Sequence, residues 1–141
     1  MGRASPTINF EFARVLLVHD DPASRLTLQT VLEAGGYAVD SAASAAEAVE
    51  KMDESKYELV LSDLQMESPE AGLKVLAHAR IMDYKPAMAL VTTYQNQPLK
   101  DTRSTLIEPQ DLPGLLEKVA SLIGERTSRL VNREVRLAGI A

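Results

Sequence analysis

Residues 57–66, YELVLSDLQM, decide the fold of this chain. The apolar run at residues 59–61 favours a β-strand, and it ends in Ser62 and then in the carboxylate of Asp63. An apolar run of this length, set between helical patterns, is typical of a central parallel strand that is buried on both faces. In an open α/β sheet the carboxyl ends of such strands carry the chemistry. Asp63 is therefore the first candidate functional residue.

The composition fits one globular domain of ordinary kind. The chain has 141 residues, 45% hydrophobic and 25% charged, which is enough for one core and too little for a second domain. It has no cysteine, which excludes a disulfide framework and a thiolate metal site. Neither a membrane-spanning run nor a signal-peptide core is present, so we expect a cytoplasmic protein without a membrane partner. The net charge of −5 argues against a general DNA binder.

Apolar runs alternate with helical patterns along the whole chain. Strands and helices that alternate at this spacing form right-handed βαβ units. The sequence therefore predicts an α/β fold, with a parallel sheet covered by helices on both faces. Besides the central run, strands are expected at residues 15–18, 37–40, 88–91 and 105–107.

Capping signals mark where the helices begin. Asp21 before Pro22 is a helix start, because aspartate accepts hydrogen bonds from free amides and proline suits the first helical position. Ser44 with Glu47 forms a capping box that opens the second helix. The buried stripe of the first helix is expected to consist of Leu26, Thr30, Val31 and Ala34.

Polar side chains follow several strands, so the parallel sheet should gather them at one edge. They are His19 and Asp20 after the first strand, Asp63 after the third, Thr92 after the fourth and Glu108 after the fifth. Carboxylates from two strand ends make a hard-oxygen site suited to Mg²⁺, and we expect Asp20 and Asp63 to form it. A carboxylate beside Mg²⁺ can act as a nucleophile toward phosphorus. His19 is expected to be a solvent-facing neighbour of this site.

Four segments follow one another in a fixed order. They are LVHDDPASR at residues 17–25, LVLSDLQM at 59–66, ALVTTY at 89–94, and the Pro109 loop with the helix after it. Together they resemble the receiver domain of two-component response regulators. The resemblance covers about residues 13–124. It implies a flavodoxin-like (βα)5 fold with strand order 2-1-3-4-5.

The resemblance also implies a role for each matching residue. Asp63 matches the phospho-acceptor, Asp20 the acidic residue that holds Mg²⁺, and Thr92 the hydroxyl that senses the phosphoryl group. Gln65 matches the position whose backbone carbonyl completes the metal site. The implied partners are a histidine kinase or phosphotransfer protein and an output protein that the sequence does not identify.

The sequence departs from the family pattern at several places, and three of them bear most on the site and the fold. His19 replaces the first of two acidic residues, and Glu108 replaces a lysine that compensates the phosphoryl charge. Only the 11 residues from Tyr94 to Ser104 separate Thr93 from the fifth strand. Because a parallel crossover needs about a dozen residues, the fourth helix is expected to be shortened or missing.

Two interpretations of function remain open. One is a single-domain receiver in a phosphorelay, phosphorylated on Asp63, with output by protein contact. The alternative is a degenerate receiver that acts as a phosphorylation-independent protein-interaction module. An enzyme is not expected, because a haloacid-dehalogenase-type hydrolase would need a second aspartate where Gln65 stands. A flavodoxin would need aromatic residues around its flavin, and only 4% of the residues are aromatic.

The C-terminal end has a charge pattern of its own. Gly124 is expected to interrupt the last helix, which begins at Asp111, and to divide a receiver domain at 13–124 from a helical tail at 125–141. Residues 1–12 are expected to form a flexible arm. The tail arginines recur at a spacing that places them along one helix face. They are Arg126, Arg129, Arg133 and Arg136. The tail is expected either to pack weakly on its own domain or to dock on an acidic surface, including that of a second copy in a homodimer.

Overall fold

A five-stranded parallel sheet forms the centre of the protein, which is described here by a computed structural model. The structure describes residues 13–63, 66, 68–91, 105–107 and 112–139. The strand order β2-β1-β3-β4-β5 confirms the predicted flavodoxin-like arrangement. The strands are β1 (Arg14–Val18), β2 (Ala38–Ala42), β3 (Leu59–Asp63), β4 (Ala87–Val91) and β5 (Thr105–Ile107).

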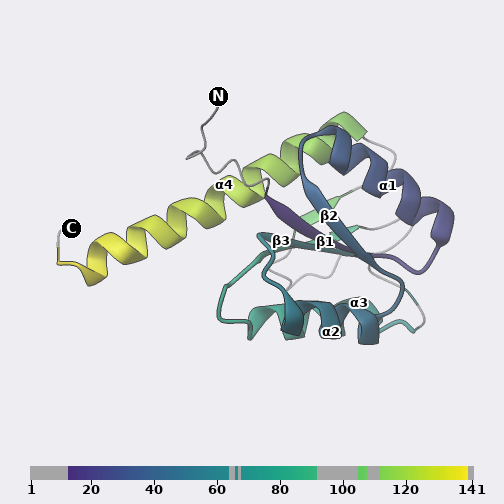
Figure 1. Cartoon of the computed structure of the whole chain (residues 1–141), viewed down its shortest axis with the longest axis horizontal. Helices are drawn as coiled ribbons and strands as arrows, with labels where there is room; N and C mark the ends of the chain where they lie inside the picture. The colour runs from purple at the N-terminus through teal and green to yellow at the C-terminus, as the bar shows by residue number, and fades with distance from the viewer. Residues whose placement is uncertain (1–12, 64–65, 67, 92–104, 108–111, 140–141) are drawn as a thin grey trace, which may run out of the picture.

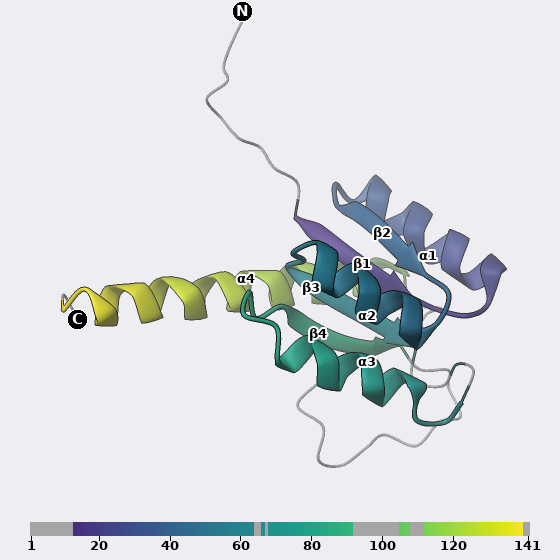
Figure 2. The same ribbon diagram turned by 60° about the horizontal axis from the view of Figure 1, so that its bottom comes forward.

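Helices cover both faces of the sheet, as the alternating pattern predicts (Figure 1). Helices α1 (Pro22–Ala34) and α4 (Leu112–Leu137) lie on one face, and α2 (Ala45–Glu54) and α3 (Ala71–Arg80) lie on the other (Figure 2). The expected shortening of a helix between β4 and β5 falls on residues 92–104, which lie outside the described residues. The expected N-terminal arm, residues 1–12, also lies outside the described residues.

The core consists of two apolar layers, one on each side of the sheet. Side chains alternate between the faces along each strand, so β1 contributes Val15 and Leu17 to one layer and Leu16 and Val18 to the other. The first layer is completed by Leu28 and Leu32 of α1, Leu59 and Leu61 of β3, and Leu115 and Val119 of α4. All five residues of β3 are buried, as expected for the central strand.

Helix α1 begins where its capping signals predict. The side chain of Asp21 accepts a hydrogen bond of 2.9 Å from the backbone amide of Ser24, and Pro22 is the first helical residue. The expected stripe is wrong at Leu26, Thr30 and Ala34, which are exposed, whereas Val31 packs against the core. Leu26 is 65% exposed, and the residues that α1 buries fully are Leu28 and Leu32.

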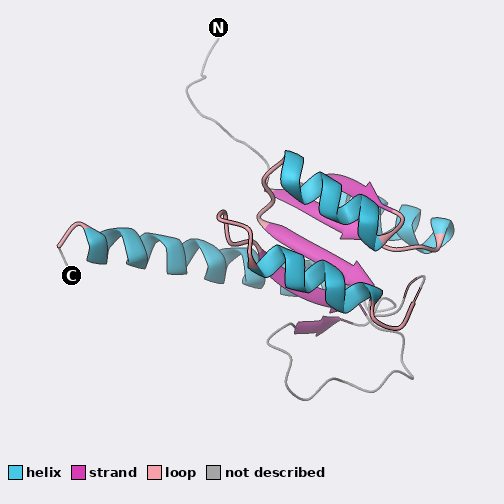
Figure 3. Cartoon of the chain, turned by 90° about the horizontal axis from the view of Figure 1, so that it is seen from below, coloured by secondary structure: helices cyan, strands magenta, loops and turns pink. Residues whose placement is uncertain are grey.

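Helix α4 is continuous through Gly124, so the expected interruption there is wrong. A glycine inside a helix costs about 1 kcal/mol relative to alanine, which is small beside the packing of Leu115 and Val119 against the sheet. The 26 residues make a helix of roughly 39 Å, and its C-terminal half runs out beyond the sheet (Figure 3). The expected tail is thus the second half of α4.

Arg126 fixes this second half of α4 to the body of the protein. Its guanidinium donates hydrogen bonds of 2.7 Å to the carbonyl oxygen of Tyr84 and 2.9 Å to that of Lys85, in the turn between α3 and β4.

Within the parts of the chain that are described, no helix is long and apolar enough to cross a membrane.

A polar network joins Arg14, at the start of β1, to Asp40 of β2 and to Tyr57, which lies just before β3. Arg14 donates a hydrogen bond of 2.8 Å to the carboxylate of Asp40, and the Tyr57 hydroxyl donates one of 2.7 Å to the same oxygen. The Arg14 guanidinium also lies 5.1 Å from the centre of the Tyr57 ring. The network ties two neighbouring strands to the chain that enters the third.

Candidate functional site

Three titratable side chains gather where β1 and β3 end. The register between these strands places Val18 opposite Ser62, so the residues that follow, His19 and Asp63, become neighbours. The imidazole Nε2 of His19 lies 3.9 Å from Asp63 Oδ2, and its Nδ1 lies 3.8 Å from Asp20 Oδ1. One ligand atom from each of the three residues lies within 4.8 Å of the others. The expected carboxylate pair is therefore brought together.

The chain around His19 is held by three hydrogen bonds. Its backbone amide donates to the carbonyl oxygen of Ala42, which continues the ladder between β1 and β2 beyond the last paired residue. Its carbonyl oxygen accepts a bond of 2.8 Å from the guanidinium of Arg25, one turn into α1. Its Nδ1 accepts a bond of 3.2 Å from the backbone amide of Asp21. These contacts fix both the backbone and the ring of His19.

The orientation of the ring decides which nitrogen faces Asp63. Because Nδ1 of His19 accepts a hydrogen bond, a neutral imidazole carries its proton on Nε2, the atom on the Asp63 side. His19 therefore presents an N–H to Asp63, and its other nitrogen faces Asp20.

The burial of the cluster is uneven. The side chains of Asp63 and His19 are only 11% and 12% exposed, whereas that of Asp20 is 42% exposed. A charge on Asp63 is consequently less screened by water than one on Asp20. The expectation that His19 faces solvent is wrong, because the ring fills the space between the two carboxylates. The only sequence signal for this was its position directly between a buried strand and Asp20.

Asp21 caps α1 and is not one of the three residues of the acidic cluster, His19, Asp20 and Asp63. The hydrogen bonds that it accepts from Ser24 hold the pKa of its carboxyl below the ordinary value, with a smaller contribution from the nearby charge of Arg25. Its carboxylate therefore acts as the helix cap that the sequence predicts.

The donor set of the cluster fits a divalent cation in part. Two carboxylates suit Mg²⁺, which binds one or two carboxylates and keeps several waters. An imidazole is a better ligand for transition metals, and Nδ1 of His19 is already engaged with the Asp21 amide. The fit to Mg²⁺ thus rests on Asp20 and Asp63. Gln65, Thr92 and Glu108, the other expected site residues, lie outside the described residues.

Comparisons with known proteins agree with this arrangement. A family model described as the response regulator receiver domain matches residues 15–106. A gliding motility regulatory protein of Myxococcus xanthus is 36% identical over 78 residues, which cover 55% of this chain and 10% of that protein. The transcriptional regulatory protein GlrR of Escherichia coli is 35% identical over 79 residues, which cover 56% of this chain and 17% of that protein. The chain therefore matches less than a fifth of the length of these relatives.

Solved structures of similar fold include two response regulator proteins from Methanospirillum hungatei and Thermotoga maritima. A CheY-like receiver domain from Methanospirillum hungatei is 25% identical, with a TM-score of 0.74, over 84% of this chain and 99% of that one. The response regulator TrrA of Thermotoga maritima, determined in complex with Mg²⁺ and BeF, is 28% identical, with a TM-score of 0.70, over 79% of this chain and 99% of that one. The family model, which spans well over half of the sequence, shows that this chain belongs to the response regulator receiver domain family.

Proposed function

We propose that this protein is a receiver in a phosphorelay and that Asp63 accepts the phosphoryl group. The observation that carries the proposal is the placement of the Asp63 carboxylate at the end of the fully buried strand β3, beside Asp20 and His19. Receiver domains work with histidine kinases or phosphotransfer proteins, so a phosphohistidine of such a partner is the proposed donor. The proposal makes the protein a signalling module rather than an enzyme.

In the proposed reaction, one carboxylate oxygen of Asp63 attacks the phosphorus atom of the donor phosphohistidine. An O–P bond forms and the P–N bond of the donor breaks, and the released imidazole nitrogen takes up a proton. Mg²⁺, when bound, would offset the negative charge of the phosphoryl oxygens and of the two carboxylates. Asp20 and Asp63 are the proposed protein ligands, together with the backbone carbonyl of Gln65.

His19 has a separate role in this proposal. Its Nε2–H points to the Asp63 side of the cluster, where it can donate a hydrogen bond to a phosphoryl oxygen after transfer. The proposed contributions of Thr92, as the hydroxyl that binds the phosphoryl group, and of Glu108, as a repulsive neighbour in place of a lysine, rest on the family resemblance.

The degenerate receiver is a second candidate, because a specific observation favours it. An imidazole occupies the place of one acidic residue in the metal cluster, which removes a hard-oxygen ligand. In that case the same fold would act as an interaction module without phosphorylation. In both cases output is proposed to occur through contact with another protein. A homodimer through the C-terminal half of α4 is the competing use of that segment, and sedimentation analysis would detect it.

Intact-mass spectrometry after incubation with Mg²⁺ and acetyl phosphate tests the proposal directly. We expect the mass of one phosphoryl group on the native chain and none on Asp63→Asn. The variant His19→Asp, which restores the second carboxylate, provides a matched comparison. An adduct on His19→Asp but not on the native chain would assign the loss to the imidazole and favour the degenerate receiver. An adduct that persists in Asp63→Asn would refute the assignment of the acceptor.

A further inference from the structure

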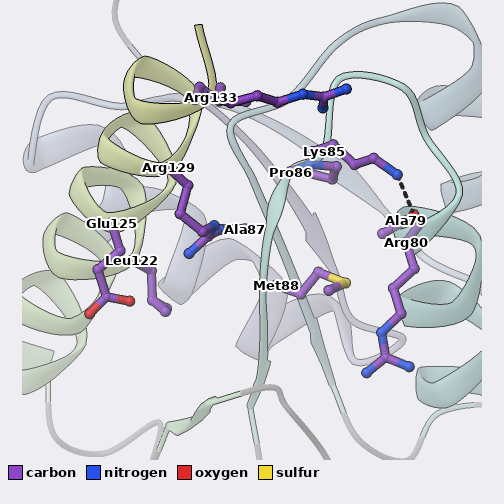
Figure 4. A pocket seen from close by; sticks show the side chains of 11 residues that line it. Ala79, Arg80, Lys85, Pro86, Ala87, Met88, Leu122, Glu125, Arg129 and Arg133 are labelled. Carbon is purple, nitrogen blue, oxygen red and sulfur yellow. Dashed lines mark hydrogen bonds between the residues drawn. The ribbon is translucent and has the colours of Figure 1, made fainter. Parts of the chain in front are cut away.

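A second site lies at the other end of the sheet. A cavity of about 730 Å³ opens between the end of α3, the start of β4 and the middle of α4 (Figure 4). Ala87, at the start of β4, lines it, whereas Val91, at the end of the same strand, is the residue paired with Asp63. Four strand residues correspond to roughly 13 Å, so the cavity is separate from the acidic cluster.

The polar lining of this cavity is strongly basic. Among the described residues that line it, four carry a positive charge and one, Glu125, a negative charge, which gives a net charge of +3 in a chain of net charge −5. The basic residues are Arg80, Lys85, Arg129 and Arg133. In the part of the chain that the structure describes, the guanidinium groups of the three arginines form no ion pair and no hydrogen bond. Their charges are therefore available to a ligand.

The rest of the lining is apolar. Arg129 reaches from α4 toward Ala87, and Met88 lies on the β4 side of the space in Figure 4. A bound group therefore meets cationic side chains beside an apolar floor. The floor consists of Ala79, Pro86, Ala87, Met88, Leu122 and Leu130.

The walls of the cavity are held in place before any ligand binds. Arg126, whose hydrogen bonds fix the turn before β4, lies one helical turn before Leu130 of the cavity lining. The same turn contains Lys85 with a φ of 46°, a left-handed conformation that is unfavourable for a residue with a side chain. Because Arg126 binds the carbonyl oxygen of Lys85, it keeps this turn against α4. A preformed site loses little conformational entropy on binding.

We propose that this cavity binds an acidic segment of a partner protein. Arg129 and Arg133 are four residues apart on α4, so their backbone positions lie about 6 Å apart along the helix and both side chains line the cavity. The segment pairs one carboxylate with each arginine, because guanidinium binds carboxylate with two parallel hydrogen bonds. An apolar side chain between these carboxylates packs on the floor near Leu130 and Ala87. The inference does not depend on phosphorylation of Asp63, which lies at the other edge of the sheet.

A peptide-display selection on the full chain tests the proposal. The probe is an unbiased library of 12-residue peptides. The affinity of the enriched peptides is then compared between two double variants: the cavity variant, Arg129→Gln/Arg133→Gln, and the control variant, Lys74→Gln/Arg136→Gln. The control pair removes the same charge from exposed positions that do not line the cavity. We expect enriched peptides with two or more acidic residues and an apolar residue. The cavity variant loses two partly exposed ion pairs of ordinary strength, so its affinity for these peptides should fall about tenfold. The affinity of the control variant should change little.

Other occupants give different results in the same experiment. Enriched peptides without acidic residues, or equal affinity for both double variants, would overturn the proposal. Light scattering after size exclusion would show a dimer that only the cavity variant loses if the occupant is a second copy, which would also overturn it. Retained circular dichroism and retained phosphorylation of Asp63 in the cavity variant would separate loss of this site from loss of the fold or of the receiver function.

Discussion

Replacing Tyr57 with phenylalanine removes one hydroxyl from the network at the start of the sheet. Tyr57 is 2% exposed, so its ring stays buried and stays beneath the Arg14 guanidinium in the variant. What is lost is the 2.7 Å hydrogen bond to the Asp40 carboxylate. A hydrogen bond to a charged group contributes about 1.5–3 kcal/mol. The side chain of Asp40 is 40% exposed and keeps its bond from Arg14, so water replaces part of this loss.

The expected destabilisation is therefore about 1 kcal/mol, somewhat below that range. Urea denaturation at pH 7 measures it. An unchanged m-value, the slope of the free energy of unfolding against urea concentration, would show that only stability has changed. Tyr37→Phe is the matched control, because the hydroxyl of Tyr37 has no hydrogen bond within the described residues. A loss equal to that of the control would contradict the argument. So would an unchanged effect of Tyr57→Phe in an Asp40→Ala background, since the partner is then absent.

Three further changes have expected outcomes that follow from single contacts. Arg126→Met should lower the free energy of unfolding by about 2 kcal/mol in urea denaturation, because the carbonyls of Tyr84 and Lys85 lose a charged donor. Asp21→Ala should lower the melting temperature at pH 7 but not well below pH 3.8, because the lowered pKa of Asp21 adds stability only where the carboxyl is ionised in the folded state. The melting temperature of the native chain should fall above about pH 10, because burial raises the pKa of Tyr84 to about 12 and folding favours its neutral form; Tyr84→Phe should reduce this fall.

Short-range patterns in the sequence predict the strands, the helix starts and the fold. They do not predict features that depend on contacts between elements far apart in the sequence. The apolar run before Asp63 and the cap at Asp21 follow from local chemistry, and both are where they are expected. The buried face of α1 was predicted around Leu26, but the residues that meet the sheet are Leu28 and Leu32. Both sets have helical spacing, and only the rotation of the helix on the sheet distinguishes them.

The same limit applies to the sites. The pairing of Asp20 with Asp63 follows from the parallel sheet alone, because the carboxyl ends of all its strands lie at the same edge. The burial of His19 could not be predicted, because it depends on the contacts of its ring with both carboxylates and with the Asp21 amide. The basic cavity depends on the meeting of α3, β4 and α4, which no single segment encodes. From the sequence, Arg129 and Arg133 could be recognised only as part of a stripe on one helix, and Arg80 on α3 gave no signal.

Phosphorylation of Asp63 and binding at the basic cavity are expected to be nearly independent. The two sites are joined by β4, whose ends are roughly 13 Å apart. Arg129 and Arg133 are exposed, so water and salt around them weaken the effect of the added phosphoryl charge at this distance. The lining turn is also fixed to α4 by Arg126 rather than by any residue of the acidic cluster. Peptide affinity should therefore change less than about twofold on phosphorylation. A larger change would contradict this expectation. If the peptide changed the affinity of the Asp63 site for Mg²⁺ or BeF by the same factor, β4 and α4 would have to shift together, and the two sites would be coupled.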